Sequence, residues 1–172
     1  DPAWAVAGSE SIAPGSLTVR FTGTSTLLFS DGETAWLIDG WFSRFSPWKL
    51  YREKIAPDVD AIARGLERNR ISRLAAVIPV HSHFDHAMDA PEVARRTGAL
   101  LLGSSSTANI GRGWGLPESQ IRVARDRETF SFGRFEVTLV ATRHFEFPDP
   151  EIRAKALGHR EIDAPLVPPV DA

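Results

Sequence analysis

Three histidines and one aspartate lie within six consecutive residues of this chain, in the segment HSHFDH. His81, His83, Asp85 and His86 come directly after the apolar run VIPV. Neutral imidazole is the commonest metal ligand in proteins, and carboxylate oxygen accompanies it at zinc and iron sites. The chain has no cysteine, so a metal site must use these two ligand types. The segment therefore predicts a metal site, in which two ions could share a bridging hydroxide as the nucleophile.

Chance clustering of surface histidines is the alternative interpretation. Polar groups crowded at the end of a buried strand are costly unless something binds them. Ligand sites of α/β sheets also lie at the carboxyl ends of the strands. We therefore favour metal binding over chance clustering.

The elements that would position these residues follow from periodicity. Residues 17–39 alternate in hydrophobicity around the Asp-Gly of SDGE, which predicts a three-stranded meander ending at Asp39. Residues 58–71 predict a helix with Asp58 at its N-cap. Residues 74–80 form a continuous apolar run, typical of a strand buried on both faces, and lead into the histidines.

Strands and helices also alternate after the histidines. Residues 90–98 predict a helix with a glycine stop, and residues 99–104 predict a second buried strand. This alternation favours a sheet that is at least partly parallel. Residues 106–119 fit a loop or a short helix, residues 120–124 fit a strand, and residues 128–142 fit a hairpin that runs into the sequence TRH.

The HSHFDH segment resembles the His-x-His-x-Asp-His motif of the metallo-β-lactamase superfamily. The meander ending in an aspartate, the helix and strand before the motif and the strand pair after it are also similar in order to that family. The resemblance is closest to its lactonase-like and phospholipase D-like metal-dependent hydrolases. It implies an α/β (α+β) fold, an αββα sandwich, of which residues 17–147 would supply about the first half.

The resemblance also implies a role for each residue of the motif. His81, His83 and His144 would bind a first metal ion. Asp85 and His86 would bind a second, and Asp85 would act in catalysis by orienting the attacking hydroxide. Asp39 would hydrogen-bond a metal ligand from beneath the site. Two zinc ions are expected, with manganese or iron as alternatives.

The family pattern is incomplete after His144. A later bridging aspartate and a final histidine are missing, and His159 is the only histidine that follows. We expect a flexible leader over residues 1–16, and a Pro-rich loop or tail over residues 148–172 that leads to a missing second half. That C-terminal half, as a separate chain or as absent residues, is the expected partner.

Residues 40–57 show no clean period but are rich in aromatic side chains. Trp41 and Phe42 are candidates for an apolar wall against a bulky or lipid-like substrate, or for a contact with lipid. Packing against the missing half is the alternative. Arg143 is a candidate for an anionic substrate group because guanidinium suits phosphate and carboxylate, and His159 is a candidate at the pocket mouth.

The predicted function is a metal-dependent hydrolase that uses a metal-bound hydroxide on an ester, lactone or phosphodiester bond. A di-iron redox or oxygen-handling protein and a non-catalytic half that needs a partner chain are the alternatives. The net charge of −2 gives no reason to expect nucleic acid, and no apolar run is long enough to span a membrane. Because the sequence begins at Asp1 instead of a methionine, we expect a processed chain and favour an exported location, periplasmic or in the cell envelope, over a cytoplasmic one.

Overall fold

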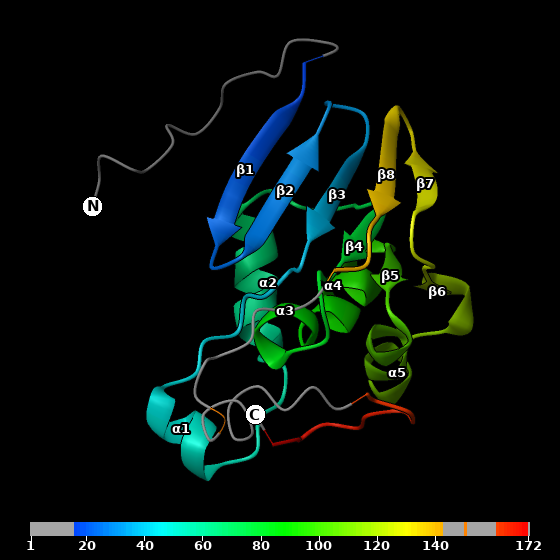
Figure 1. The fold of residues 1–172 in the computed structure, drawn as a ribbon. Coiled ribbons are helices and arrows are strands. Elements are labelled where there is room, and N and C mark those ends of the chain that lie inside the picture. The colour runs from blue at the N-terminus through cyan, green and yellow to red at the C-terminus, as the bar shows by residue number, and fades with distance from the viewer. Residues whose placement is uncertain (1–15, 143–149, 151–160, 172) are drawn as a thin grey trace.

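The computed structural model describes residues 16–142, 150 and 161–171 (Figure 1). Within them, six strands form one sheet in the order β1-β2-β3-β4-β5-β6, and a separate hairpin pairs β7 with β8. The strands are Thr18–Gly23 (β1), Thr26–Ser30 (β2), Ala35–Ile38 (β3), Ala76–Ile78 (β4), Leu100–Gly103 (β5), Ile121–Val123 (β6), Glu128–Phe132 (β7) and Phe135–Leu139 (β8). The helices are Pro47–Arg52 (α1), Val59–Arg68 (α2), Phe84–Ala87 (α3), Ala90–Thr97 (α4) and Ser105–Gly113 (α5), with a 3₁₀ turn at Glu118–Gln120.

The sheet is antiparallel at one side and parallel at the other. β1, β2 and β3 form the predicted meander, with neighbouring strands antiparallel. β4, β5 and β6 then add in parallel, each after a helical crossover. The partly parallel sheet expected from the sequence is therefore confirmed. Because β3 and β4 are parallel neighbours, the segments that follow them leave the sheet at the same edge.

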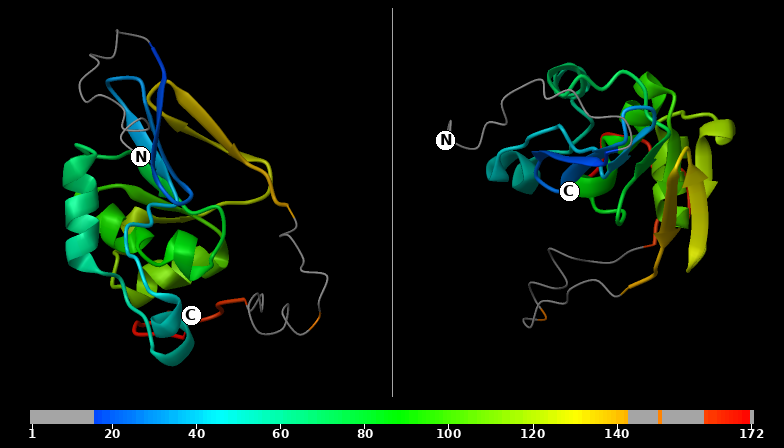
Figure 2. Two further views of the ribbon diagram at one scale, coloured as in Figure 1. Left: turned by 90° about the vertical axis from the view of Figure 1, so that its left-hand side faces the viewer. Right: turned by 90° about the horizontal axis from the view of Figure 1, so that it is seen from above.

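Helices α2, α4 and α5 lie on one face of the sheet and the hairpin lies on the other (Figures 1 and 2). On the helix side, apolar residues of α2 and α4 pack with Leu37, Val77 and Leu101 in one buried core. On the other side, Trp36, Ile78 and Leu102 form a second cluster that the hairpin β7–β8 partly covers. Trp36 stacks on Phe29, with ring centroids 4.3 Å apart. The second face is therefore apolar but is only partly covered by the described chain.

The least covered part of that face lies on the edge strand β1. Leu17, Val19 and Phe21 alternate on one side of the strand and are 61%, 50% and 65% exposed. In register, Val19 pairs with Phe29, and Phe21 pairs with Leu27. The exposed side chains thus extend the apolar surface of the second face out to the sheet edge. Such a surface is typical of a region that another segment covers.

Helix α1 lies in the segment for which the sequence showed no period. Ser46 caps it, because its side-chain oxygen accepts a hydrogen bond from the Lys49 backbone N–H at 3.2 Å. Pro47 occupies the first turn, where its missing N–H costs nothing. None of its residues is buried, so no apolar stripe was there to predict it. For residues 106–119 the helix is the correct alternative, with α5 capped by Ser104.

The described part of the C-terminal segment runs along α5 and then past α1 (Figure 1). The Asn109 side chain donates to the Ile162 carbonyl, and the Ser106 hydroxyl accepts from the Ile162 N–H. Ile55 and Val170 exchange two backbone hydrogen bonds. The expected leader, apart from Ser16, and residues 148, 149, 151–160 and 172 of the expected tail lie outside the described residues. Among the helices that are described, none has the length and apolar character to cross a membrane.

Candidate metal centre

The three clustered histidines come together in the turn after β4. The strand ends at Ile78, the chain bends, and His83 occupies the N-cap of the short helix α3. The His83 carbonyl accepts hydrogen bonds from the backbone N–H groups of His86 and Ala87. The ring centroid of His81 lies 4.5 Å from that of His83 and 4.0 Å from that of His86. One tight turn therefore gathers three imidazoles at the carboxyl end of a buried strand.

Asp39 joins this turn to the end of β3. Its side chain is fully buried, and its backbone adopts a positive φ of 61°. One carboxylate oxygen accepts from the Val80 backbone N–H at 2.9 Å, and the other lies 2.8 Å from His86 Nδ1. An ionised carboxylate only accepts hydrogen bonds, so His86 Nδ1 carries the proton and Nε2 is left to bind a cation. This contact lies where Asp39 was expected, while the metal-binding role of His86 stays a prediction.

Asp85 approaches the other ring nitrogen of His86. Its Oδ2 lies 3.6 Å from His86 Nε2. Burial lowers the pKa of His86, but the hydrogen bond to Asp39 and the charges of Asp39 and Asp85 outweigh it, and the net shift is upward. The two carboxylates therefore favour a positive charge at the His86 ring. A metal ion would supply that charge in place of a proton.

The residue types at this turn fit a metal site, but their described side chains do not converge on one point. Imidazole nitrogens with a carboxylate beside them are the ligands that zinc, iron and manganese accept. Within the described ranges, no three His, Asp or Glu side chains are arranged to hold a single ion. The predicted ligand set also includes His144, which lies outside the described residues, as do Arg143 and His159.

Trp41 and Phe42 occupy different environments. The Trp41 ring meets that of Phe84 edge to face, with centroids 5.9 Å apart, so it stands beside the histidine turn. Its backbone N–H donates to the buried hydroxyl of Thr26. Phe42 is buried in the core on the helix side, where a Cβ placed on Gly65 would overlap with its ring. We therefore retain Trp41 as a candidate substrate contact and do not propose Phe42 as one.

Asp89 is a residue that sequence reasoning missed. It is fully buried, and one oxygen accepts from the backbone N–H groups of Phe42 at 2.8 Å and Ser43 at 2.6 Å. The other oxygen accepts from the Ser43 hydroxyl, which in turn accepts from the Asp58 N–H. Burial raises the pKa of Asp89 to about 6, although these hydrogen bonds and Arg44 oppose it. Asp89 thus fixes the loop that carries Trp41.

Sequence reasoning missed Asp89 because its position was ambiguous. An aspartate directly before Ala-Pro at a helix start is typical of an N-cap, and Asp89 occupies that position without making a side-chain capping bond. Its partners lie 46 and 47 residues earlier in the chain. No local signal could reveal a contact at that separation.

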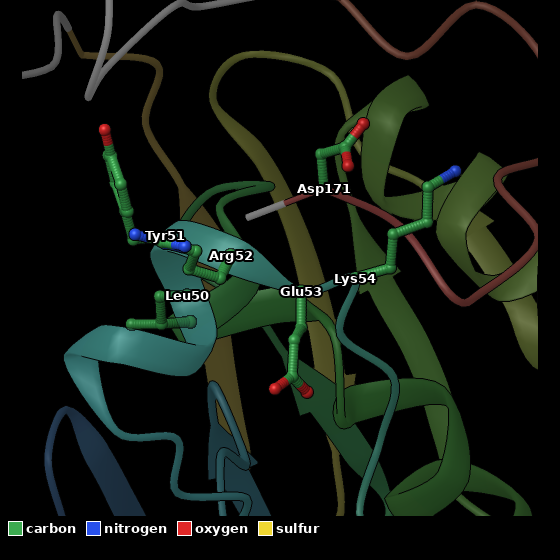
Figure 3. A pocket seen from close by; sticks show the side chains of 6 residues that line it. All are labelled: Leu50, Tyr51, Arg52, Glu53, Lys54 and Asp171. Atoms are coloured by element: carbon green, nitrogen blue, oxygen red, sulfur yellow. The ribbon is translucent and has the colours of Figure 1, made fainter.

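Two cavities among the described residues lie away from the histidines. One, of about 420 Å³, is lined by Leu50–Lys54 and Asp171 (Figure 3). The other, of about 720 Å³, lies between the β2–β3 turn, residues 72–75, Gly98 and Gly133. It borders residues 74 and 75, which precede β4, whereas the histidines follow that strand. The histidine turn is partly exposed and forms part of neither cavity.

Comparison with known protein sequences finds metal-dependent hydrolases. No family model matches the sequence. A UPF0173 metal-dependent hydrolase of Heliobacterium modesticaldum is 26% identical over 122 residues, which cover 71% of this chain and 44% of that protein. One of Myxococcus xanthus is 34% identical over 87 residues, covering 49% of this chain and 30% of that protein. The chain thus spans less than half the length of the curated relatives it matches.

Comparison with solved structures finds metallo-β-lactamases. SMB-1 in a complex with mercaptoacetic acid aligns with a TM-score of 0.51 at 20% identity, covering 70% of this chain and 48% of that one. A HARLDQ motif mutant from Cronobacter sakazakii aligns with a TM-score of 0.50 at 17% identity, covering 76% and 51%. At such identities the likeness concerns the fold, and it confirms the fold class expected from the sequence. About half of each neighbour has no counterpart in this chain.

Proposed function

We propose that this chain, which has the fold of the metallo-β-lactamases and is similar in sequence to metal-dependent hydrolases, is the part of a metal-dependent hydrolase that supplies most of the metal ligands. The observation that carries the proposal is the chain of contacts Asp39–His86–Asp85 beside two further imidazoles. A buried carboxylate that fixes the proton of a histidine on Nδ1 is the usual support of a metal-bound imidazole.

Each residue of the turn has its own task in this proposal. His81 and His83, with His144, would hold one metal ion, and Asp85 and His86 would hold a second. Bound metal would activate water and polarise the bond to be cleaved. Asp85 is only partly exposed and lies against His86, so its free oxygen could orient the attacking water. Zinc is the metal that we expect, because the donor set is nitrogen-rich.

The substrate class is an ester, lactone or phosphodiester. Trp41 and Phe84 form an aromatic pair next to the histidines and would contact the apolar part of such a substrate. The buried indole N–H of Trp41 has no hydrogen-bond partner among the described residues. Buried donors are rarely left unpaired, so this group would donate to an acceptor of the substrate or of a further segment of protein. Arg143 and His159 remain candidates for polar contacts to the substrate.

A second half of the fold is the proposed partner of the uncovered sheet face. Leu17, Val19 and Phe21 extend an apolar surface that the hairpin does not reach fully. The matched relatives and structural neighbours are at least about twice as long as the aligned region. A further layer of chain on this face would bury these side chains and could add the missing metal ligands.

The test is metal content and turnover in the same preparation. Purified protein is analysed for bound metals and assayed with ester, lactone and phosphodiester substrates before and after chelation. We expect activity to disappear with the metal and to return with zinc. Asp85→Asn should abolish turnover, whereas Asp60→Asn, the same change on the exposed surface of α2, should not. Full activity in a His81→Ala, His83→Ala variant would contradict the proposal, and bound iron with a coloured protein would favour the redox alternative.

A further inference from the structure

Helix α1 is the most exposed helix of the described chain. None of its residues is buried, and Trp48 and Tyr51 are 63% and 82% exposed. The two aromatic residues are three positions apart, so they lie on the same side of the helix. Figure 3 shows the side chains of Tyr51, in α1, and Glu53, directly after it, pointing in opposite directions. Large exposed aromatic side chains of this kind mark an interaction surface.

Cationic side chains surround these aromatic residues. Residues 44–54 carry Arg44, Lys49, Arg52 and Lys54 against one acidic residue, Glu53, in a chain whose net charge is −2. The Arg52 guanidinium lies 4.2 Å from the Trp48 ring, and the Lys49 ammonium lies 5.3 Å from the Phe45 ring. Residues 44–54 thus combine exposed aromatic side chains with an excess of positive charge.

We propose that residues 44–54 are a membrane-docking surface that binds anionic phospholipid. Tryptophan and tyrosine settle at the level of lipid headgroups, where an apolar ring and a polar edge are both satisfied. Arginine and lysine beside them are attracted to the negative surface potential of such a membrane. Both components are present on α1, and they are presented together on one short, protruding helix (Figure 1).

A lipid surface suits this segment better than a nucleic acid does. Six helical residues extend for only about 9 Å, which is too short to follow a phosphate backbone over several nucleotides. Binding to a membrane through a few aromatic rings and cationic groups, in contrast, needs only a small surface on the protein.

Docking through α1 would orient the candidate metal centre. The loop that leads to α1 follows Asp39 at the end of β3, and the histidine turn follows β4 at the same edge of the sheet. A membrane that binds α1 would therefore face this edge. The proposal concerns binding and does not depend on hydrolysis, so the two can fail separately.

The test is flotation of the purified protein with vesicles of phosphatidylcholine containing about 30% phosphatidylglycerol, and with phosphatidylcholine alone. We expect binding to the anionic vesicles only, and loss of binding in 0.5 M salt, where charges are screened. Lys49→Gln, Arg52→Gln should weaken the partition about tenfold or more, because each charge near the surface contributes roughly fivefold. Trp48→Ala, Tyr51→Ala should weaken it without removing the salt dependence.

The matched control is Arg64→Gln, Arg68→Gln, which removes two exposed charges from α2. It should bind vesicles like the unmodified protein, and circular dichroism should show all variants folded, since only exposed side chains change. Three results would each overturn the proposal: no binding to anionic vesicles, equal weakening in the control, or retained binding in both α1 variants.

Discussion

Asp39 has an unfavourable backbone conformation, and each of its two carboxylate oxygens has a hydrogen-bond partner. A positive φ is uncommon outside glycine, although aspartate tolerates it better than most residues. Its side chain bonds the Val80 N–H with one oxygen and His86 with the other. Glycine at this position would relieve the backbone but could not orient the histidine. The side-chain contacts, and not the turn alone, therefore account for an aspartate here.

Asp39→Asn separates the orienting role from the packing role. The amide oxygen can still accept from Val80, but the amide NH₂ would then face His86 Nδ1, which must become an acceptor, so that the proton moves to Nε2. We expect zinc affinity to fall about 10- to 100-fold with little change in fold. Isothermal titration with zinc measures this. Asp31→Asn, at another buried aspartate that bonds two backbone N–H groups, should leave zinc affinity unchanged.

Asp89 should give the protein a distinctive dependence of stability on pH. Its pKa is about 6 in the folded state, above the value of about 4 of a solvated aspartate. Between about pH 4 and pH 6, Asp89 is protonated in the folded state but ionised in the unfolded state. Its protonation therefore stabilises the fold fully below about pH 4, and this stabilisation is lost as pH rises through about 6.

The comparison that isolates this effect is Asp89→Asn, which cannot titrate. Between pH 5 and pH 7 the unmodified protein should lose about 1 kcal/mol more of its free energy of unfolding than the variant loses. Urea denaturation at both pH values provides the measurement. Asp31→Asn is the control, because the pKa of Asp31 is lowered and the group stays ionised across this range. Equal pH dependence in the Asp89→Asn variant and the unmodified protein would contradict the assignment.

At the scale of elements, α2 and the loop after β3 fit together at Gly65. A Cβ at this position would overlap with the Phe42 ring, which is buried and cannot move aside easily. Alanine normally stabilises a helix interior by about 1 kcal/mol relative to glycine. Here the overlap should outweigh that gain.

Gly65→Ala should therefore lower the free energy of unfolding by about 1–2 kcal/mol, since overpacking a core costs this much beyond the gain in helix propensity. Thermal or urea unfolding measures the change. Combining it with Phe42→Leu should recover part of the loss, because the smaller side chain makes room. A double variant whose loss equals the sum of the two single losses would rule out the contact as the cause.

Periodicity predicted most elements, because strands β2 to β5 and helix α2 bury one side or both, and because β1 and the hairpin alternate apolar and polar residues. It failed for α1, whose residues are all at least partly exposed. In the site, HSHFDH was visible because its ligands are adjacent in sequence. The loop contacts of Asp89 and the core position of Phe42 depend on segments about 46 residues apart and on side-chain direction. Such contacts follow from the assembled sheet and cannot be read from a local pattern.

At the scale of the whole molecule, the described chain has one well-covered sheet face and one that is open toward β1. An edge strand with exposed apolar side chains promotes association. We expect the chain, without further protein on this face, to self-associate at micromolar concentrations in sedimentation velocity. Val19→Asp, Phe21→Asp should shift it toward the monomer and change the free energy of unfolding by less than about 0.5 kcal/mol.

The control for this experiment places the same charge elsewhere on the strand and its turn. Thr18→Asp, Thr24→Asp adds two aspartates away from the exposed apolar side chains and should leave association unchanged. Dissociation by both double variants would mean that charge alone, and not the apolar face, governs association.

The links from Asp39 to His86 and from Ser43 to Asp89 have a consequence for folding kinetics. They join residues 47 and 46 positions apart and close the same loop between β3 and the histidine turn. Closing this loop costs chain entropy. Once one of the two links has formed, the second forms without paying that entropy again, so each link favours the other. The oriented histidine thus appears only after β3 and β4 have met, which is slow compared with helix formation. A metal ion added during refolding should therefore bind at the rate at which β3 pairs with β4. Faster diffusion of the ion to the histidine turn should not speed up its binding.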